Sequence, residues 1–155
     1  MNYVGIQKSS LVNGEGVRVV LWVSGCEHKC RGCQNQFAWD PDSGEPFDEE
    51  DEKELMLAVK RNFIDGLTLS GGDPMFPDNR DEITRICKAV KEETGKTIWM
   101  YTGYKMEEIS NEKVLKYLDV IVDGEFIEEL KDDSYMWAGS TNQRIWRKVD
   151  GQWTT

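Results

Sequence analysis

The chain has 155 residues, a formal net charge of −10 and 31% charged residues. This length accommodates one domain with a hydrophobic core, so we expect a single domain over residues 1–155. A strongly acidic protein repels phosphate backbones, which argues against nucleic acid as a partner. No apolar run reaches the length of a membrane span and the N-terminus lacks a signal-peptide pattern, so we expect a cytoplasmic protein without a membrane partner.

Strand and helix patterns alternate along the first half of the chain. A near-continuous apolar run predicts a buried strand over Val17–Val23. Acidic residues followed by apolar residues at helical spacing predict a helix over Asp48–Phe63. The apolar face of that helix would consist of Leu55, Met56, Val59 and Phe63. A second short strand is predicted over Gly66–Ser70.

The second half of the chain continues the alternation. A helix is predicted over Asp81–Thr94, and Gly95 is its C-terminal stop. The later predicted elements are a strand over Thr97–Tyr101, short helices over Lys105–Ile109 and Glu112–Tyr117, and strands over Leu118–Val122 and Gln143–Val149. Because strands alternate with helices, we expect right-handed crossovers and an α/β fold with a mostly parallel sheet.

Four of the predicted strands end in loops that contain glycine. These loops are Gly25-Cys26, Gly71-Gly72-Asp73, Thr102-Gly103 and Asp123-Gly124. In parallel sheets the loops beyond the carboxyl ends of the strands carry the chemistry. We therefore expect the four loops to line one edge of the sheet and to form a single site.

Three of the four cysteines crowd into eight residues directly after the first predicted strand. Cys26, Cys30 and Cys33 have the spacing C-x-x-x-C-x-x-C. Three thiolates can hold three irons of a cubane cluster and leave the fourth iron open, and an open metal position is typical of a catalytic site. The fourth cysteine, Cys87, has helical spacing with apolar neighbours, so we expect it in the core.

Other interpretations of the cysteines stay open at this point. Cys30 and Cys33 alone could form a thioredoxin-like dithiol, which would leave Cys26 unexplained. A structural zinc site could use the cysteines with His28, although the position of His28 midway between Cys26 and Cys30 would strain a tetrahedral site. For His28, the only histidine, we favour a hydrogen bond to backbone or to cluster sulfur over metal ligation.

A Gly-Gly-Asp-Pro turn follows the second predicted strand. Gly71 and Gly72 would let the backbone approach a ligand, and the Asp73 carboxylate could accept a hydrogen bond from a cationic amino group. Together with the cysteine triad, this turn resembles the radical S-adenosylmethionine superfamily. That superfamily often has an aromatic residue just before the last cysteine, where this chain has Gly32.

The segment around the cysteines resembles one family of that superfamily more closely. It reads Gly25-Cys26-Glu-His28-Lys-Cys30-Arg-Gly32-Cys33-Gln-Asn35 and is similar to the signature of the activating proteins of anaerobic ribonucleoside-triphosphate reductase. Further similar segments are Asn13–Arg18, Tyr101–Tyr104, Asp123–Phe126 and Gly139–Arg144. The resemblance extends over about residues 10–146.

This resemblance implies an enzyme with two cofactors. Cys26, Cys30 and Cys33 would ligate a [4Fe-4S] cluster, and S-adenosylmethionine would chelate the open iron. Reductive cleavage would give methionine and a 5′-deoxyadenosyl radical, which would take a hydrogen atom from a glycine of the reductase. Gly71, Gly72 and Asp73 would hold the methionine amino end, and Gly32, Cys33 and Gln34 would lie near the adenosyl portion.

The resemblance also implies the partners and the architecture. The partners would be the large glycyl-radical subunit of the reductase and an external one-electron donor such as a flavodoxin. The whole chain would form a single radical S-adenosylmethionine domain. Because the chain is too short for eight strand–helix units, we expect an incomplete, open (β/α) barrel whose opening admits the glycine-bearing loop of the partner.

Two rival functions and several residues outside the motifs stay open. One rival is another glycyl-radical activase, such as the one that serves pyruvate formate-lyase, which tends to have a longer chain and extra strands. The other is a zinc or iron–sulfur module without catalytic activity. Arg144, Arg147 and Lys148 form a modest basic patch, which is either a solvated face or a docking surface. Trp22 and Trp99 lie in strand patterns, so we expect them in the core.

Overall fold

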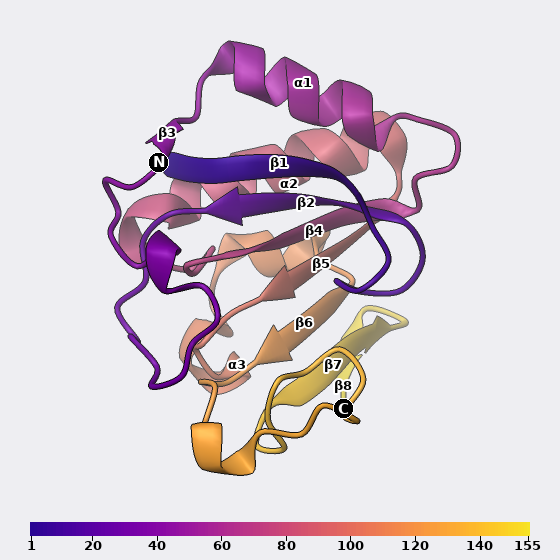
Figure 1. Cartoon of the computed structure of the whole chain (residues 1–155). Helices are drawn as coiled ribbons and strands as arrows, with labels where there is room; N and C mark the ends of the chain where they lie inside the picture. Colours follow the sequence, from indigo (N-terminus) through magenta and orange to yellow (C-terminus); the bar gives the residue numbers. More distant parts are fainter.

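Eight strands form one mixed sheet in the order β3-β1-β2-β4-β5-β6-β7-β8 (Figure 1). The structure is a computed structural model that describes residues 1–155. The strands are β1 (Asn2–Ser10), β2 (Arg18–Val23), β3 (Glu45–Pro46), β4 (Gly66–Gly71), β5 (Thr97–Tyr101), β6 (Val120–Asp123), β7 (Arg144–Val149) and β8 (Gln152–Thr154). The α-helices are α1 (Glu49–Val59), α2 (Arg80–Thr94) and α3 (Met106–Ile109), and the 3-10 helices are η1 (Gln36–Ala38), η2 (Pro77–Asn79), η3 (Lys113–Tyr117) and η4 (Glu128–Leu130).

Only the centre of the sheet is parallel. Strands β2, β4, β5 and β6 pair in parallel, whereas the pairs β1-β2, β1-β3, β6-β7 and β7-β8 are antiparallel. The expectation of a mostly parallel sheet is therefore wrong, although the α/β class is confirmed. The physical reason is that loops without a crossover helix join β1 to β2 and β7 to β8, and such connections return the chain antiparallel.

Most predicted elements are present with shifted bounds. Strand β5 has the predicted bounds, and α2 ends at Gly95, which adopts the left-handed conformation with φ 66°. Helix α1 ends at Val59 rather than at Phe63, and the Phe63 side chain is exposed instead of contributing to the apolar face. The second short helix is the 3-10 helix η3, and β6 starts two residues later than predicted.

Strands β1, β3 and β8 were not predicted. Strand β1 is mostly half-buried or exposed, so its sequence lacks the apolar run that indicates a buried strand. Strands β3 and β8 have only two and three residues, which is too short for a periodic pattern. The tail strand predicted over Gln143–Val149 is β7.

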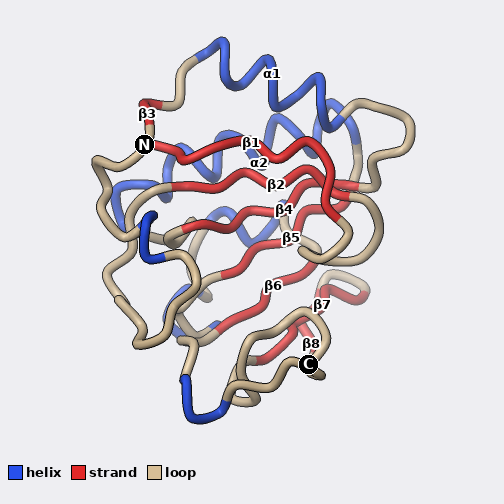
Figure 2. The backbone as a smooth tube through the Cα atoms, in the orientation of Figure 1, coloured by secondary structure: helices blue, strands red, loops and turns tan.

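The central strands present two different faces because successive side chains alternate across a strand. One face packs against α1 and α2, which Figure 2 shows behind and beside the strands. This face belongs to a core of 24 buried residues. The strand residues on this helix-covered face are Val19, Leu21, Val23, Leu67, Leu69, Ile98, Met100 and Ile121. The opposite face has a buried apolar cluster of only three residues, Trp99, Val120 and Val122.

No helix in this structure combines the length and the apolar composition that a membrane span requires.

Candidate functional site

A cavity of about 610 Å³ lies on the face of the sheet that the helices leave uncovered. Loops that follow β2, β4, β5 and β6 line it with Cys26, Cys30, Cys33, Gly71, Gly72, Asp73, Thr102, Gly103 and Gly124. The expectation that the glycine-containing loops meet at a single site is confirmed, because the carboxyl ends of parallel strands share one sheet edge.

Strand side chains and two unpredicted segments complete the walls of the cavity. Trp22, Ser70, Tyr101 and Val122 line it from the central strands. Trp22, which we expected in the core, is half-buried there and donates from Nε1 to Gln7 Oε1 at 3.1 Å. The two further segments are 11–13 and 133–139. Neither follows a parallel strand, so strand–loop reasoning did not identify them.

All three clustered cysteines are free thiols that line the cavity and are half-buried. Burial raises the pKa of the Cys26 thiol, and the backbone N–H groups of Lys29 and His28 offset this effect only in part. Burial likewise raises the pKa of Cys30. Ligation of a metal must therefore displace protons from these thiols. Cys87 is fully buried in the main core, as expected.

The donor set fits a cubane cluster better than a single metal ion. No three His, Cys, Asp or Glu side chains converge closely enough to hold one metal ion, and both ring nitrogens of His28 face carboxylates. The geometry therefore gives no support to a zinc site built from the cysteines and His28. In a cubane each thiolate binds its own iron, so the three cysteines need only border one space, and Cys26, Cys30 and Cys33 all line the same cavity.

Gly71 and Gly72 permit a close approach between two backbone segments. Gly71 has φ 117°, and a Cβ atom there would lie 2.4 Å from the Val23 carbonyl oxygen. A Cβ atom on Gly72 would lie 2.5 Å from the carbonyl oxygen of Gly25. That same oxygen accepts a hydrogen bond from the Asp73 N–H at 2.7 Å. The two glycines thus let the turn after β4 dock onto the start of the cysteine loop.

The Asp73 carboxylate is buried and connects three loops of the site. Its Oδ1 accepts from Met75 N and Thr102 Oγ1, both at 2.8 Å. Its Oδ2 accepts from Gly103 N at 2.9 Å and from His28 Nε2 at 2.8 Å. A carboxylate has about four lone-pair positions, and all of them are occupied here. One of these donors must move before Asp73 can accept directly from a ligand.

His28 bridges two carboxylates from different loops. In addition to the Asp73 contact, its Nδ1 lies 3.2 Å from Glu125 Oε2. Burial lowers the pKa of His28, but the hydrogen bonds and charges of Asp73 and Glu125 outweigh burial, so the pKa is raised. The preferred expectation that His28 bonds backbone or cluster sulfur is wrong, because carboxylates that are distant in sequence approach both ring nitrogens.

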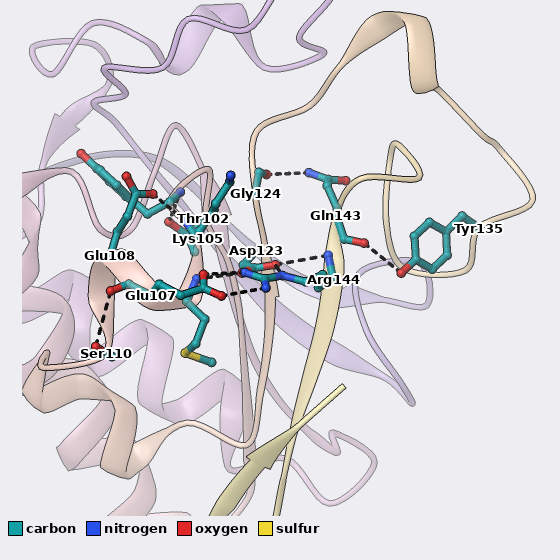
Figure 3. Close-up of polar contacts among 12 residues, drawn as sticks. Thr102, Lys105, Glu107, Glu108, Ser110, Asp123, Gly124, Tyr135, Gln143 and Arg144 are labelled. Carbon is teal, nitrogen blue, oxygen red and sulfur yellow. Dashed lines mark hydrogen bonds and ion pairs between the residues drawn. The ribbon is translucent and has the colours of Figure 1, made fainter.

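Residues of the Gly139–Arg144 segment form hydrogen bonds that hold the C-terminal part of the chain next to the site (Figure 3). The Gln143 side chain accepts from Gly139 N at 2.7 Å and donates to the Gly124 carbonyl at 2.9 Å. Its backbone carbonyl accepts from Tyr135 Oη at 2.9 Å. Gln143 therefore joins the loop after β6 to the segment 133–139 that walls the cavity.

The residues of the predicted basic patch are engaged within the chain. Arg144 pairs with the buried carboxylate of Asp123 at 2.6 Å and with Glu107 at 2.7 Å (Figure 3). A separate set of contacts joins Arg147 to Glu15 at 2.7 Å and Lys148 Nζ to the Leu115 carbonyl at 2.8 Å. Each of the three cations thus has a carboxylate or a carbonyl partner within the chain. The geometry therefore favours an intramolecular role for these residues over a role in docking a partner protein.

Three free thiols and several glycine-containing loops line one cavity, and cysteine thiolates are the usual ligands of iron–sulfur clusters, so this site is typical of an iron–sulfur protein. Residues 12–146 match the family described as "4Fe-4S single cluster domain". Proteins named "Anaerobic ribonucleoside-triphosphate reductase-activating protein" from Enterobacteria phage T4, Haemophilus influenzae and Escherichia coli are 46%, 43% and 40% identical to the chain. The alignments cover 99%, 95% and 94% of this chain and 98%, 98% and 97% of those relatives. The chain belongs to the family of anaerobic ribonucleoside-triphosphate reductase-activating proteins.

Proposed function

We propose that this protein is an activase that cleaves S-adenosylmethionine reductively at a [4Fe-4S] cluster and generates a glycyl radical on anaerobic ribonucleoside-triphosphate reductase. The observation that carries the proposal is the meeting of three cysteine thiols and four glycine-containing loops at one cavity. The match to a 4Fe-4S single cluster domain and the names of the relatives support it. The whole chain is then one radical S-adenosylmethionine domain.

Cys26, Cys30 and Cys33 are the proposed cluster ligands. Each releases its thiol proton to bind one iron, and the short loop holds no fourth cysteine for the remaining iron. A bound cluster would supply the electron that cleaves the sulfonium of S-adenosylmethionine. Trp22, Tyr101 and the segment 133–139 line the same cavity and give it partly apolar surroundings.

The proposed contacts to S-adenosylmethionine lie on two sides of the cysteines. The turn of Gly71, Gly72 and Asp73 holds the methionine amino end, and all three residues line the cavity. Cys33 and Gln34, which also line it, lie near the adenosyl portion. Gly32 is exposed and does not line the cavity. It has φ 77°, so its proposed role is to form the backbone turn that places Cys33 and Gln34 near the adenosyl portion.

The open form of the sheet supports access for a protein substrate. The linear strand order leaves two edges, β3 and β8, so we propose that the sheet corresponds to an incomplete barrel. Leu11, Val12 and Met136 line the cavity and have exposed side chains. The glycine-bearing loop of the reductase would enter there, while an external one-electron donor such as a flavodoxin reduces the cluster. Reduced thiols are typical of the cytoplasm, where we propose that the reaction takes place.

Anaerobic reconstitution with iron and sulfide tests this function. The reduced protein should convert S-adenosylmethionine to methionine and 5′-deoxyadenosine, and addition of the reductase should produce a glycyl radical detectable by electron paramagnetic resonance. Pyruvate formate-lyase is the control substrate, because a radical on that protein instead would favour the rival activase. A fully assembled cluster that yields no 5′-deoxyadenosine would identify a binding module without catalytic activity and would overturn the proposal.

A further inference from the structure

The loop between the first two cysteines is attached to the rest of the site through one side chain. Among residues 27–29, only His28 makes side-chain hydrogen bonds to other loops. Its side chain is 10% exposed and meets Asp73, whose side chain is 1% exposed. By contrast, the Arg31–Glu128 ion pair further along the same loop is 88% and 48% exposed, and pairs of that kind contribute little.

The His28 ring lies against the loop after β5. A Cβ atom on Gly103 would lie 2.5 Å from His28 Cδ2 and 2.7 Å from Nε2, so only glycine leaves space for the ring. The Tyr104 ring packs edge-on against the imidazole with centroids 4.4 Å apart. The ring is therefore held in one orientation by Gly103, Tyr104 and the two carboxylates.

These contacts connect all four loops of the site through His28. The imidazole belongs to the loop after β2, Asp73 to the turn after β4, Gly103 to the loop after β5 and Glu125 to the loop after β6. The hydrogen bonds of Asp73 also hold the Gly71–Asp73 turn in place, and this turn lines the cavity beside the cysteines. A displacement of the ring would thus change the position of the cysteine loop relative to the Gly71–Asp73 turn.

We propose that His28 is a positioning residue that holds the cysteine loop in register with the Gly71–Asp73 turn, so that a ligand on the open iron also reaches that turn. This inference rests on the proposed function, because it concerns the binding of S-adenosylmethionine beside the cluster. His28 does not bind the cluster itself: both ring nitrogens face carboxylates. It acts through Asp73, in the way that outer contacts orient the groups that bind a metal centre.

Replacement of His28 by three different residues tests the inference. H28Q keeps a donor close to the position of Nε2 and preserves the bond to Asp73, whereas H28N keeps a donor only near Nδ1 and H28A keeps none. With reconstituted, reduced protein, S-adenosylmethionine is titrated while its effect on the cluster signal is followed by electron paramagnetic resonance. We expect H28A and H28N to weaken binding by about tenfold or more, and H28Q to restore most of it. Iron and sulfide content should stay the same in all three.

A pair of glycine substitutions tests the same contact without changing His28. G103A should displace the ring from Asp73 and weaken binding as H28A does. G5A is the matched control, because a Cβ atom on Gly5 meets nothing within 4 Å. If H28A fails to assemble a cluster, the G103A and G5A pair decides the question.

Each outcome separates this inference from the proposed function. Equal weakening in H28Q and H28A, or wild-type affinity in H28A or G103A, would overturn the positioning role while the proposed function stands. If wild-type protein with a complete cluster shows no change in signal with S-adenosylmethionine, the proposed function fails, and the positioning role fails with it.

Discussion

The two faces of the central sheet differ in both composition and packing. The helix-covered face contributes aliphatic side chains to a core of 24 buried residues. The cavity face has three buried apolar residues and carries the polar side chains of Arg18, Thr68 and Ser70. Apolar burial is the main favourable term in folding, so the helix-covered face supplies most of the stability. The cavity face instead borders the candidate site.

Arg18 shows that the cavity face is nevertheless well ordered. Its guanidinium is almost completely buried, and burial lowers its pKa to about 10. It donates to the Thr68 hydroxyl at 2.9 Å and to the Leu67 and Thr97 carbonyls at 3.0 and 2.8 Å. These bonds join the starts of three neighbouring strands, so a polar network stabilises the face that lacks an apolar core.

The largest effect is expected from the thiols of the cavity face. Replacing Cys26, Cys30 or Cys33 by Ala should abolish cluster assembly and the formation of 5′-deoxyadenosine together, because each thiol would hold a separate iron. The melting temperature of the cluster-free protein should change little, since these side chains are only half-buried. Iron and sulfide analysis and thermal unfolding measure the two effects. If a variant retained a complete cluster, the cysteine replaced in it would not be a cluster ligand.

The helix-covered face should respond in the opposite way. Leu69→Ala removes a fully buried side chain from the main core, so the free energy of unfolding should fall by about 2–5 kcal/mol. Urea unfolding of the cluster-free protein measures this loss. The iron content per folded molecule should equal that of the wild type. A selective loss of cluster without a loss of stability would contradict the division between the faces.

The reactivity of Cys87 allows a direct comparison between a core thiol and the three cavity thiols. Burial raises the pKa of Cys87 well above its ordinary value, so iodoacetamide should alkylate it only after unfolding, while the three cavity cysteines react in the folded, cluster-free protein. Cys87→Ala should spare the cluster and cost about 1 kcal/mol of stability. Mass spectrometry of the alkylated peptides identifies the reactive positions. Rapid alkylation of Cys87 in folded protein would contradict its place in the core.

The smallest effect is expected at an ion pair that belongs to neither face. The hydrogen bonds and charge of Arg144 lower the pKa of Glu107 to about 2. A carboxylate with a lowered pKa stabilises the fold above its ordinary pKa, and this contribution is lost as the pH falls from about 5 towards 2. Glu107→Gln should therefore flatten the pH dependence of stability in that window and leave the stability at pH 7 only slightly reduced. Thermal unfolding across this range checks the slope, which should stay steep in the control Glu92→Gln.

The sequence alone predicted the central elements and most of the site. The apolar run of β2, the glycine-ended strands and the cysteine spacing are local signals, because each depends on neighbouring residues. They placed Cys26, Cys30, Cys33 and the Gly71–Asp73 turn together, and the cavity contains all of them. The antiparallel outer strands were missed because short or half-exposed strands leave no periodic pattern.

The tertiary structure decided how these local motifs act on one another. His28 meets Asp73 and Glu125 across separations of 45 and 97 residues, and no local pattern predicts such contacts. No local pattern predicts the segments 11–13 and 133–139 either, which line the cavity from distant parts of the chain. The sequence by itself determined which reactive side chains and turn glycines the candidate site offers, because these lie close together along the chain. The register of the four loops depends on strand pairing and on buried hydrogen bonds, so it follows only from the fold.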